Sequence, residues 1–315
     1  MTGLATCSRP SWEASMKTAR AIEPNAGTRR EYAKRVNRLV NQFLDLMTDE
    51  ILLHVADAGD LVAQDWSLSK PTRKADREKL RRIRARVLAA WKRDPAAFAA
   101  DIDDYVSRNI VRWTGYLDRS AEKLAQWVAR SIAADVTNAQ KQAYLSAGIS
   151  PEVFKDKWTI PVVRQHISPT AARLIPSIVE ESVGNIERLA LSKASRLQQV
   201  ITEGLAQGHT VSKVKQTLRS FGGFDESTAT SWAIDQTCRI TQSILRANDA
   251  ELGVTKGVWI HVPGQYTSRE THRALHGKTF DLDVGLYDKD VGANVVPGEL
   301  RFCRCIYRPV LPFNV

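Results

Sequence analysis

The sequence lacks the features that mark secreted and membrane-spanning proteins. Its first twenty residues contain no continuous apolar stretch that could serve as the core of a signal peptide. The longest apolar runs, such as ILLHVA at 51–56, are far too short to cross a bilayer. No internal repeat of fixed period is present. We therefore expect a protein that is made in the cytoplasm and has no membrane partner.

Cysteine is also scarce, with four residues in a chain of 315. In a reducing cytosol these side chains are expected to be thiols, or metal ligands where the geometry allows it. Cys7 falls in a stretch with little apolar periodicity, and Cys238 falls inside a strong helical pattern that predicts a buried position. Only Cys303 and Cys305 are close together in the sequence, so they are the pair of interest.

The remaining composition is that of an ordinary globular protein with an uneven distribution of charge. Hydrophobic residues make up 43% and charged residues 25%, and the net charge is +10. Residues 70–93 hold eleven Lys or Arg against Asp76 and Glu78, a net charge of +9. Clustered cations attract phosphates without regard to base sequence, so this segment predicts non-specific binding of double-stranded DNA. The alternative is an ordinary solvated face. The predicted DNA-binding residues are Lys70, Arg73, Lys74, Arg77, Arg81, Arg82, Arg84, Arg86, Lys92 and Arg93.

Apolar residues recur at helical spacing over most of the chain, which predicts a mainly α fold with a small α+β unit at the C-terminal end. The expected organisation is a flexible arm over 1–28, an N-terminal helical domain over 29–160, a middle helical region over 170–250 and the α+β unit over 251–315. The expected helices are 32–58, a basic helix within 70–93, helical stretches between 95 and 146, and helices at 171–206, 210–222 and 226–249. Alternating apolar residues predict strands at 257–262 and 301–310.

The stretch THRALHG at 271–277 places His272 and His276 one turn apart on the same helix face. Thr267 and Glu270 have the spacing of a capping box, and Gly277 is expected to end the helix. In the predicted strand, Cys303 and Cys305 project from the same face. Two imidazoles and two thiols would suit tetrahedral Zn²⁺, so these four residues are a candidate metal site.

Two other interpretations of this stretch stay open. The histidines and cysteines can form a hydrogen-bonded structural cluster without metal. They can also belong to the active centre of a metal-dependent nuclease or toxin-like effector. However, Arg273 stands where a zinc protease helix has its general-base Glu. The aspartates of FDLDVGLYDKD at 280–290 could replace that base in principle, but acidic residues at this density in a loop are usually solvated.

The order of the C-terminal motifs resembles a known family. CRITQSILRANDAELG (238–253) is followed by GVWI (257–260), SRETHRALHGKTF (268–280) and PGELRFCRCIYRP (297–309). This order resembles the C-terminal domain of the phage Mu F-like head morphogenesis proteins, also called minor capsid or minor head proteins. The resemblance covers about residues 170 to 310. The motif positions are Arg239, Trp259, Arg269, His272, Leu275, Gly277, Lys278, Pro297, Cys303, Arg304, Cys305 and Pro309.

The resemblance implies a virion protein that is not an enzyme. It implies a location in the virion or procapsid interior and roles in procapsid assembly and in DNA packaging or delivery. The implied partners are the portal protein, scaffold or coat proteins and double-stranded DNA, with no small-molecule substrate and no cofactor apart from the candidate zinc. A weaker alternative is a cellular helical adaptor unrelated to phage.

Overall fold

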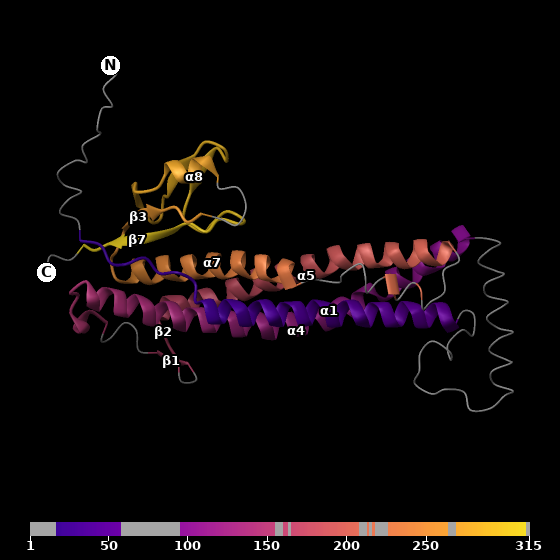
Figure 1. The fold of residues 1–315 in the computed structure, drawn as a ribbon. Coiled ribbons are helices and arrows are strands. Elements are labelled where there is room, and N and C mark those ends of the chain that lie inside the picture. Colours follow the sequence, from indigo (N-terminus) through magenta and orange to yellow (C-terminus); the bar gives the residue numbers. More distant parts are fainter. Residues whose placement is uncertain are drawn as a thin grey trace, which may run out of the picture. The chain divides into compact units, whose positions relative to one another are not determined.

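The computed structural model describes residues 17–57, 95–154, 160–162, 165–207, 213, 216–217, 226–263 and 269–312. The chain is mainly helical with short strands near its C-terminal end, as predicted (Figure 1). It divides into two compact units. The first unit combines 1–32, 126–179 and 231–315, and the second combines 33–125 and 180–230. These units do not follow the predicted domain boundaries, because the long helices contribute residues to both.

Four long helices account for most of the described chain. They are α1 (Ala26–Asp57), α4 (Pro95–Ser146), α5 (Pro169–Ala206) and α7 (Glu226–Glu251). Pro169 opens α5, where its missing N–H costs nothing, and the backbone N–H of Ala171 donates to Oγ of Ser168 at 2.9 Å. The predicted helices at 32–58, 171–206 and 226–249 are therefore confirmed within a few residues. Among the described residues, no helix is long and apolar enough to span a membrane.

The second unit buries large side chains of α1 and α4. Phe43 and Met47 of α1 and Trp113 and Leu117 of α4 are almost completely buried. The indole N–H of Trp113 donates to Oε2 of Glu50 at 2.7 Å, so the polar atom of the largest core side chain is satisfied. Apolar periodicity in the two helices is thus sufficient to explain this core.

The first unit contains a buried polar cluster around Asp249 of α7. Its carboxylate accepts hydrogen bonds from Tyr144 and Gln140 of α4 and from Tyr307 at 2.7 Å. Burial raises the pKa of Asp249 to about 7, although these three donors act to lower it. The adjacent Asn248 donates to Oε1 of Gln140 at 2.9 Å. Hydrogen bonds therefore connect α7 with α4 and with the C-terminal strand inside this unit.

A three-stranded antiparallel sheet forms the C-terminal part of the first unit. β3 (Lys256–Ile260) lies between β4 (Thr279–Asp281) and β7 (Ile306–Val310). The short helix α8 (Glu270–Ala274) follows β3, and a hairpin of β5 (Leu286–Asp288) and β6 (Ala293–Val295) follows β4. Figure 1 shows β3 and β7 beside α7, with α8 farther from that helix. Earlier in the chain lie a 3₁₀ turn at Pro151–Phe154 and a hairpin of β1 (Ile160–Val162) and β2 (Gln165–Ile167).

The prediction of a flexible arm over 1–28 is wrong for the described residues from 17 onward. Thr18 forms an antiparallel bridge with Val310, and the N–H of Ala19 donates to the carbonyl of Pro309 at 3.2 Å. Ala19 and Ile22 are buried. The reason is that β7 is an edge strand, whose free backbone groups need partners. Residues 26–28 already belong to α1.

Two local predictions in the C-terminal unit are also wrong. The strand expected at 301–310 begins only at Ile306, because Phe302 has a φ of +61° and the chain turns there. The residue that caps α8 is Arg269, without a side-chain cap hydrogen bond, so Glu270 is the first helical residue and not the third position of a capping box. Thr267, most of the predicted helix at 210–222 and the basic segment 70–93 lie outside the described residues.

Candidate functional site

Helix α8 carries His272 and is attached to strand β3 by the turn that follows it. Gly277 has a φ of +80°, which favours glycine, and its N–H donates to the carbonyl of Trp259 at 2.8 Å. The N–H of Trp259 in turn donates to the carbonyl of Lys278 at 2.9 Å. Helix α8 ends at Ala274 with Leu275 as its C-cap, so the prediction that Gly277 ends the helix is wrong by about three residues. The turn at Gly277 fixes the position of α8 relative to the sheet.

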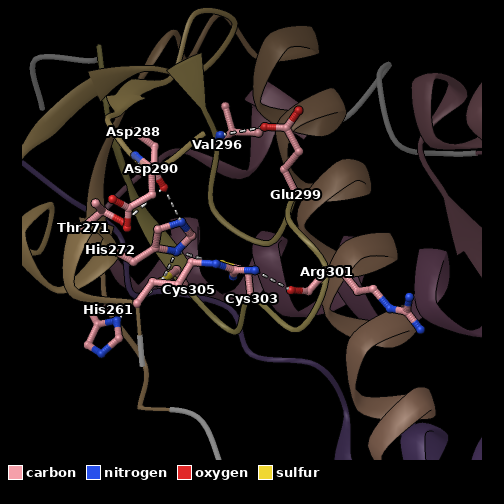
Figure 2. A network of polar contacts seen from close by, with 11 residues as sticks. His261, Thr271, His272, Asp288, Asp290, Val296, Glu299, Arg301, Cys303 and Cys305 are labelled. Carbon is pink, nitrogen blue, oxygen red and sulfur yellow. Dashed lines mark hydrogen bonds and ion pairs between the residues drawn. The ribbon is translucent and has the colours of Figure 1, made fainter. Parts of the chain in front are cut away.

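His272 lies between a carboxylate and two thiols (Figure 2). Its Nε2 is 3.1 Å from Oδ2 of Asp288, and both side chains are almost inaccessible to solvent. On the other side of the ring, Nδ1 is 3.3 Å from Sγ of Cys303 and 3.6 Å from Sγ of Cys305. These three His and Cys ligand atoms all lie within 4.8 Å of one another. The fold therefore brings together His272, Cys303 and Cys305, three of the four residues that were predicted as a metal site.

Asp288 comes from the hairpin and is held in place by its neighbours. The hydroxyl of Thr271 donates to Oδ2 at 3.2 Å, and the backbone N–H of Asp290 donates to Oδ1 at 2.9 Å. Burial raises the pKa of Asp288, but these two donors and His272 outweigh it and hold the pKa below its usual value. Asp288 is therefore a fixed negative charge that faces the imidazole.

The cysteines follow a turn at Phe302, and a residue of α7 accepts a hydrogen bond from this turn. Phe302 is the only described non-glycine residue with a positive φ, and its backbone N–H donates to Oδ1 of the buried Asp235. The N–H of Cys303 donates to the carbonyl of Leu300 at 2.9 Å, which closes the turn. This backbone path, and not the alternation of a strand, directs both sulfurs toward His272.

The protonation of the cluster follows from these contacts. A hydrogen bond from Cys305 is the main cause that lowers the pKa of Cys303, with His272 acting in the same direction. The same pair interaction, together with burial, raises the pKa of Cys305. Burial lowers the pKa of His272, but the hydrogen bond and charge of Cys303 outweigh burial and raise it. One thiolate stabilised by the second thiol and by the imidazole is thus the favoured state of this group.

His276 lies outside this group. It is exposed, and its Nδ1 accepts the backbone N–H of His261 at 3.1 Å. The histidine that approaches the cysteines instead is His261, at the end of β3, whose Nδ1 is 3.6 Å from Sγ of Cys305. Burial, followed by the charge of Arg273, lowers the pKa of His261 below its usual value.

Several residues of the predicted motif serve the fold around this group. Trp259 is fully buried with its ring edge-on to His272, and Leu275 is also buried. Arg269 donates to the carbonyl of Arg301 at 3.1 Å, which connects α8 with the cysteine turn. Two of the motif prolines contact other elements: the carbonyl of Pro297 accepts a hydrogen bond from Arg246 at 3.2 Å, and Pro309 pairs with Gly257 in the sheet. Arg239 lies on α7, and Arg304 lies between the two cysteines in the sequence.

Cys303, His272 and Asp288 have the order of a nucleophile, a base and an orienting carboxylate. A nucleophile must reach its substrate, but Cys303 and His272 are 3% and 2% exposed. A second thiol, Cys305, also occupies the side of the ring that faces Cys303. The arrangement is therefore suited to holding three chain segments together, or to holding a cation, rather than to attacking a substrate.

Sequence reasoning missed Asp288 and His261. Asp288 lies in the acidic stretch that was expected to be solvated, and only its place two residues after Leu286 in a short strand indicates that it faces inward. His261 lies at the end of the predicted strand, 44 residues before Cys305, and no sequence pattern indicates that the two side chains are close. Counting the histidines of the last sixty residues would have included His261 as a third candidate.

Comparison with known proteins identifies the region that contains this group. Residues 195–308 match the family described as Phage Mu protein F like protein. This part of the chain is a phage Mu F-like region. The resemblance predicted from the motifs is thus confirmed, and the match extends from the second half of α5 to β7.

One curated relative has no assigned activity. An uncharacterized protein of Haemophilus influenzae (strain ATCC 51907 / DSM 11121 / KW20 / Rd) is 22% identical over 147 residues, which is 47% of this chain and 32% of that protein. The match thus spans about a third of the relative's length. No solved structure matches the chain.

Proposed function

We propose that the protein is a minor head protein that acts in procapsid assembly and in the packaging or delivery of DNA. The observation that carries the proposal is the Mu F-like match over 195–308. In this account the protein resides in the procapsid or virion interior and binds the portal protein, or scaffold or coat proteins. The long helices offer extended surfaces for such contacts.

The proposed role is structural and not enzymatic. The group around His272 has the residue types of an active centre, yet its side chains are buried. Most of the surrounding motif residues pair backbone groups or fill the core of the C-terminal unit, as Trp259 and Gly277 do. A nuclease would need an accessible metal-bound water and a general base beside it. The burial of this group supports the structural role over the nuclease alternative.

We further propose that the basic segment 70–93 contacts packaged DNA through phosphates. Its net charge of +9 accounts for nearly all of the chain's net charge of +10. Contacts with phosphates release counterions, so the affinity should fall steeply as salt rises. Such binding suits a protein that meets DNA of any sequence inside a head.

Charge reversal tests the DNA contact. One variant carries all four changes Arg81→Glu, Arg82→Glu, Arg84→Glu and Arg86→Glu. The slope of log affinity against log salt is negative, and we expect its magnitude to become smaller by about 3 to 4, because each phosphate contact contributes about 0.9. Filter binding to duplex DNA over a range of salt concentrations measures this slope. The matched control reverses four exposed basic residues of the described helices: Lys34, Arg38, Arg119 and Lys123. Equal slopes for the two variants would refute DNA contact through 70–93.

The assembly role is tested in a phage that carries this gene. A null mutant should produce procapsids that are aberrant or fail to fill with DNA, and the wild-type gene supplied in trans should restore filled heads. Electron microscopy of purified particles gives the fraction of filled heads. A null mutant with the normal fraction of filled, infectious heads would overturn the proposed function, whatever the DNA-binding result.

A further inference from the structure

We propose that His261, His272, Cys303 and Cys305 form a structural binding site for one zinc ion. The proposal rests on the geometry of the C-terminal part of the first unit. It does not depend on the assembly role proposed above. It also replaces His276, which the sequence indicates as the second histidine ligand, with His261.

The ligand atoms of His272, Cys303 and Cys305 all lie within 4.8 Å of one another, which fits a single ion, whereas His261 approaches only Cys305. A tetrahedral zinc site holds sulfur at about 2.3 Å and nitrogen at about 2.0 Å, which places a sulfur and a nitrogen ligand about 3.5 Å apart. Here the sulfur–nitrogen distances are 3.3 Å and 3.6 Å from His272 to Cys303 and Cys305. The distance from His261 to Cys305 is also 3.6 Å. Two segments, α8 and the cysteine turn, thus present three ligand atoms at zinc-like spacing, and His261 would complete the site by turning toward them.

Hydrogen bonds to a Cys303 thiolate and coordination of a cation are two ways to satisfy the atoms of this group. Nδ1 of His272 has either one lone pair or one proton, directed along one line in the plane of the ring. Two sulfurs nevertheless share this nitrogen, and both are buried. A cation between the three atoms would satisfy all of them at once, because it accepts electron pairs from several directions.

The surroundings of His272 match those of a metal-bound histidine. Histidine ligands commonly direct their other ring nitrogen toward a carboxylate, which keeps the proton on that nitrogen and the lone pair toward the metal. Nε2 of His272 faces Asp288 at 3.1 Å, and Asp288 is itself fixed by Thr271 and Asp290. When zinc is bound, the Nε2 proton would face Asp288 and the Nδ1 lone pair would face the metal.

The contacts of the two remaining histidines distinguish their roles. Nδ1 of His276 is already the acceptor for the backbone N–H of His261. His261 lies beside Cys305 and supplies the fourth ligand, while His276 positions the end of β3. A site with four protein ligands has no open position for a substrate or an activated water, so zinc here stabilises the fold. Zinc binds thiolates, so binding releases the proton that the second cysteine still holds.

Metal titration of the full-length chain tests the site. The protein is stripped with a chelator under reducing conditions and titrated with Co²⁺, then with Zn²⁺. We expect one Co²⁺ per chain with the absorption bands of tetrahedral thiolate coordination, displaced by one Zn²⁺. Zinc should also protect Cys303 and Cys305 from alkylation, located by peptide mass spectrometry. Equal alkylation with and without zinc, together with no cobalt spectrum, would overturn the proposal.

Single substitutions then identify the ligands. His261→Ala should weaken zinc binding by at least about 10-fold, and Asp288→Asn by about 10- to 100-fold through the orientation of His272. His276→Ala should retain one zinc per chain, and Cys238→Ser is the control for a buried cysteine outside the group. If His276→Ala loses zinc and His261→Ala retains it, the assignment of the fourth ligand is wrong. The wild-type titration decides the existence of the site even if a variant does not fold.

Discussion

At the scale of single residues, Asp249 is a carboxyl whose burial strongly changes its pKa. It is fully buried in the first unit, and its pKa is about 7 instead of the ordinary 3.8. Burial causes the shift, because the charged form loses its hydration. The folded protein therefore binds this proton more tightly than the unfolded chain does.

This pKa predicts how stability changes with pH. Below about pH 4 the Asp249 carboxyl is protonated in both the folded and the unfolded state, and its contribution to stability is fully present. Between about pH 4 and pH 7 it is protonated only in the folded state. The free energy of unfolding should therefore fall as pH rises through this window, by up to about 1.4 kcal/mol per pH unit from this group. Asp249→Asn should flatten the profile.

Urea unfolding at several pH values between 4.5 and 8 measures this effect. The difference between wild type and variant isolates Asp249, because other buried carboxyls such as Asp235 also have raised pKa values. Asp283→Asn, at an exposed position, is the matched control and should keep the wild-type slope. If Asp249→Asn has that slope too, the carboxyl is not protonated in the folded state.

Neither Asp249 nor Asp288 could be recognised as buried from the sequence. Asp249 lies in the polar run RANDAE, and its partners Tyr144 and Tyr307 are more than fifty residues away in either direction. Asp288 lies in an acidic stretch with several exposed neighbours. Burial of a charged residue depends on partners supplied by the tertiary fold, and local patterns contain no information about them.

At the scale of elements, the cysteine turn stores backbone strain at Phe302. A non-glycine residue in the left-handed region costs about 1 to 2 kcal/mol, and Phe302 has a φ of +61°. Its ring is half exposed, so it contributes little to the core. The contact of its N–H with Asp235 holds the backbone in this conformation.

A pair of substitutions at this position tests the strain. Phe302→Gly should be more stable than Phe302→Ala by about 1 kcal/mol, because both lose the ring and only glycine relieves the strain. At an ordinary helical position, such as exposed Glu122 of α4, the order of Gly and Ala should reverse. Chemical denaturation of the four variants gives these differences. The same order at both positions would show that the turn is not strained.

The elements themselves were predictable to very different degrees. The stripe of apolar residues in α5, from Ile178 to Ile201, is strong enough to fix that helix from the sequence alone. Apolar alternation also located β3 within two residues. It failed at 301–305, because a left-handed phenylalanine leaves no mark in a polarity pattern. The polarity pattern also failed at 17–20, because the conformation of these residues depends on pairing with β7, which is distant in the sequence.

At the scale of the whole molecule, division into units was the least predictable feature. Both units combine segments that are far apart in the sequence, as residues 1–32 and 231–315 do in the first unit. Periodicity reports which face of a helix is buried, but not which segment covers it. The family resemblance supplied part of what periodicity could not, since its motif connects His272 with Cys303 and Cys305, which lie together in the matched region.

The central proposal is that this chain is a structural component of a phage head. Quantitative mass spectrometry of purified procapsids and DNA-filled heads tests it most directly. We predict that the chain is present in both particles at a constant ratio to the portal protein across preparations. Absence from both particles, with recovery of the chain only in the soluble fraction bound to host proteins, would contradict the claim and favour a cellular adaptor.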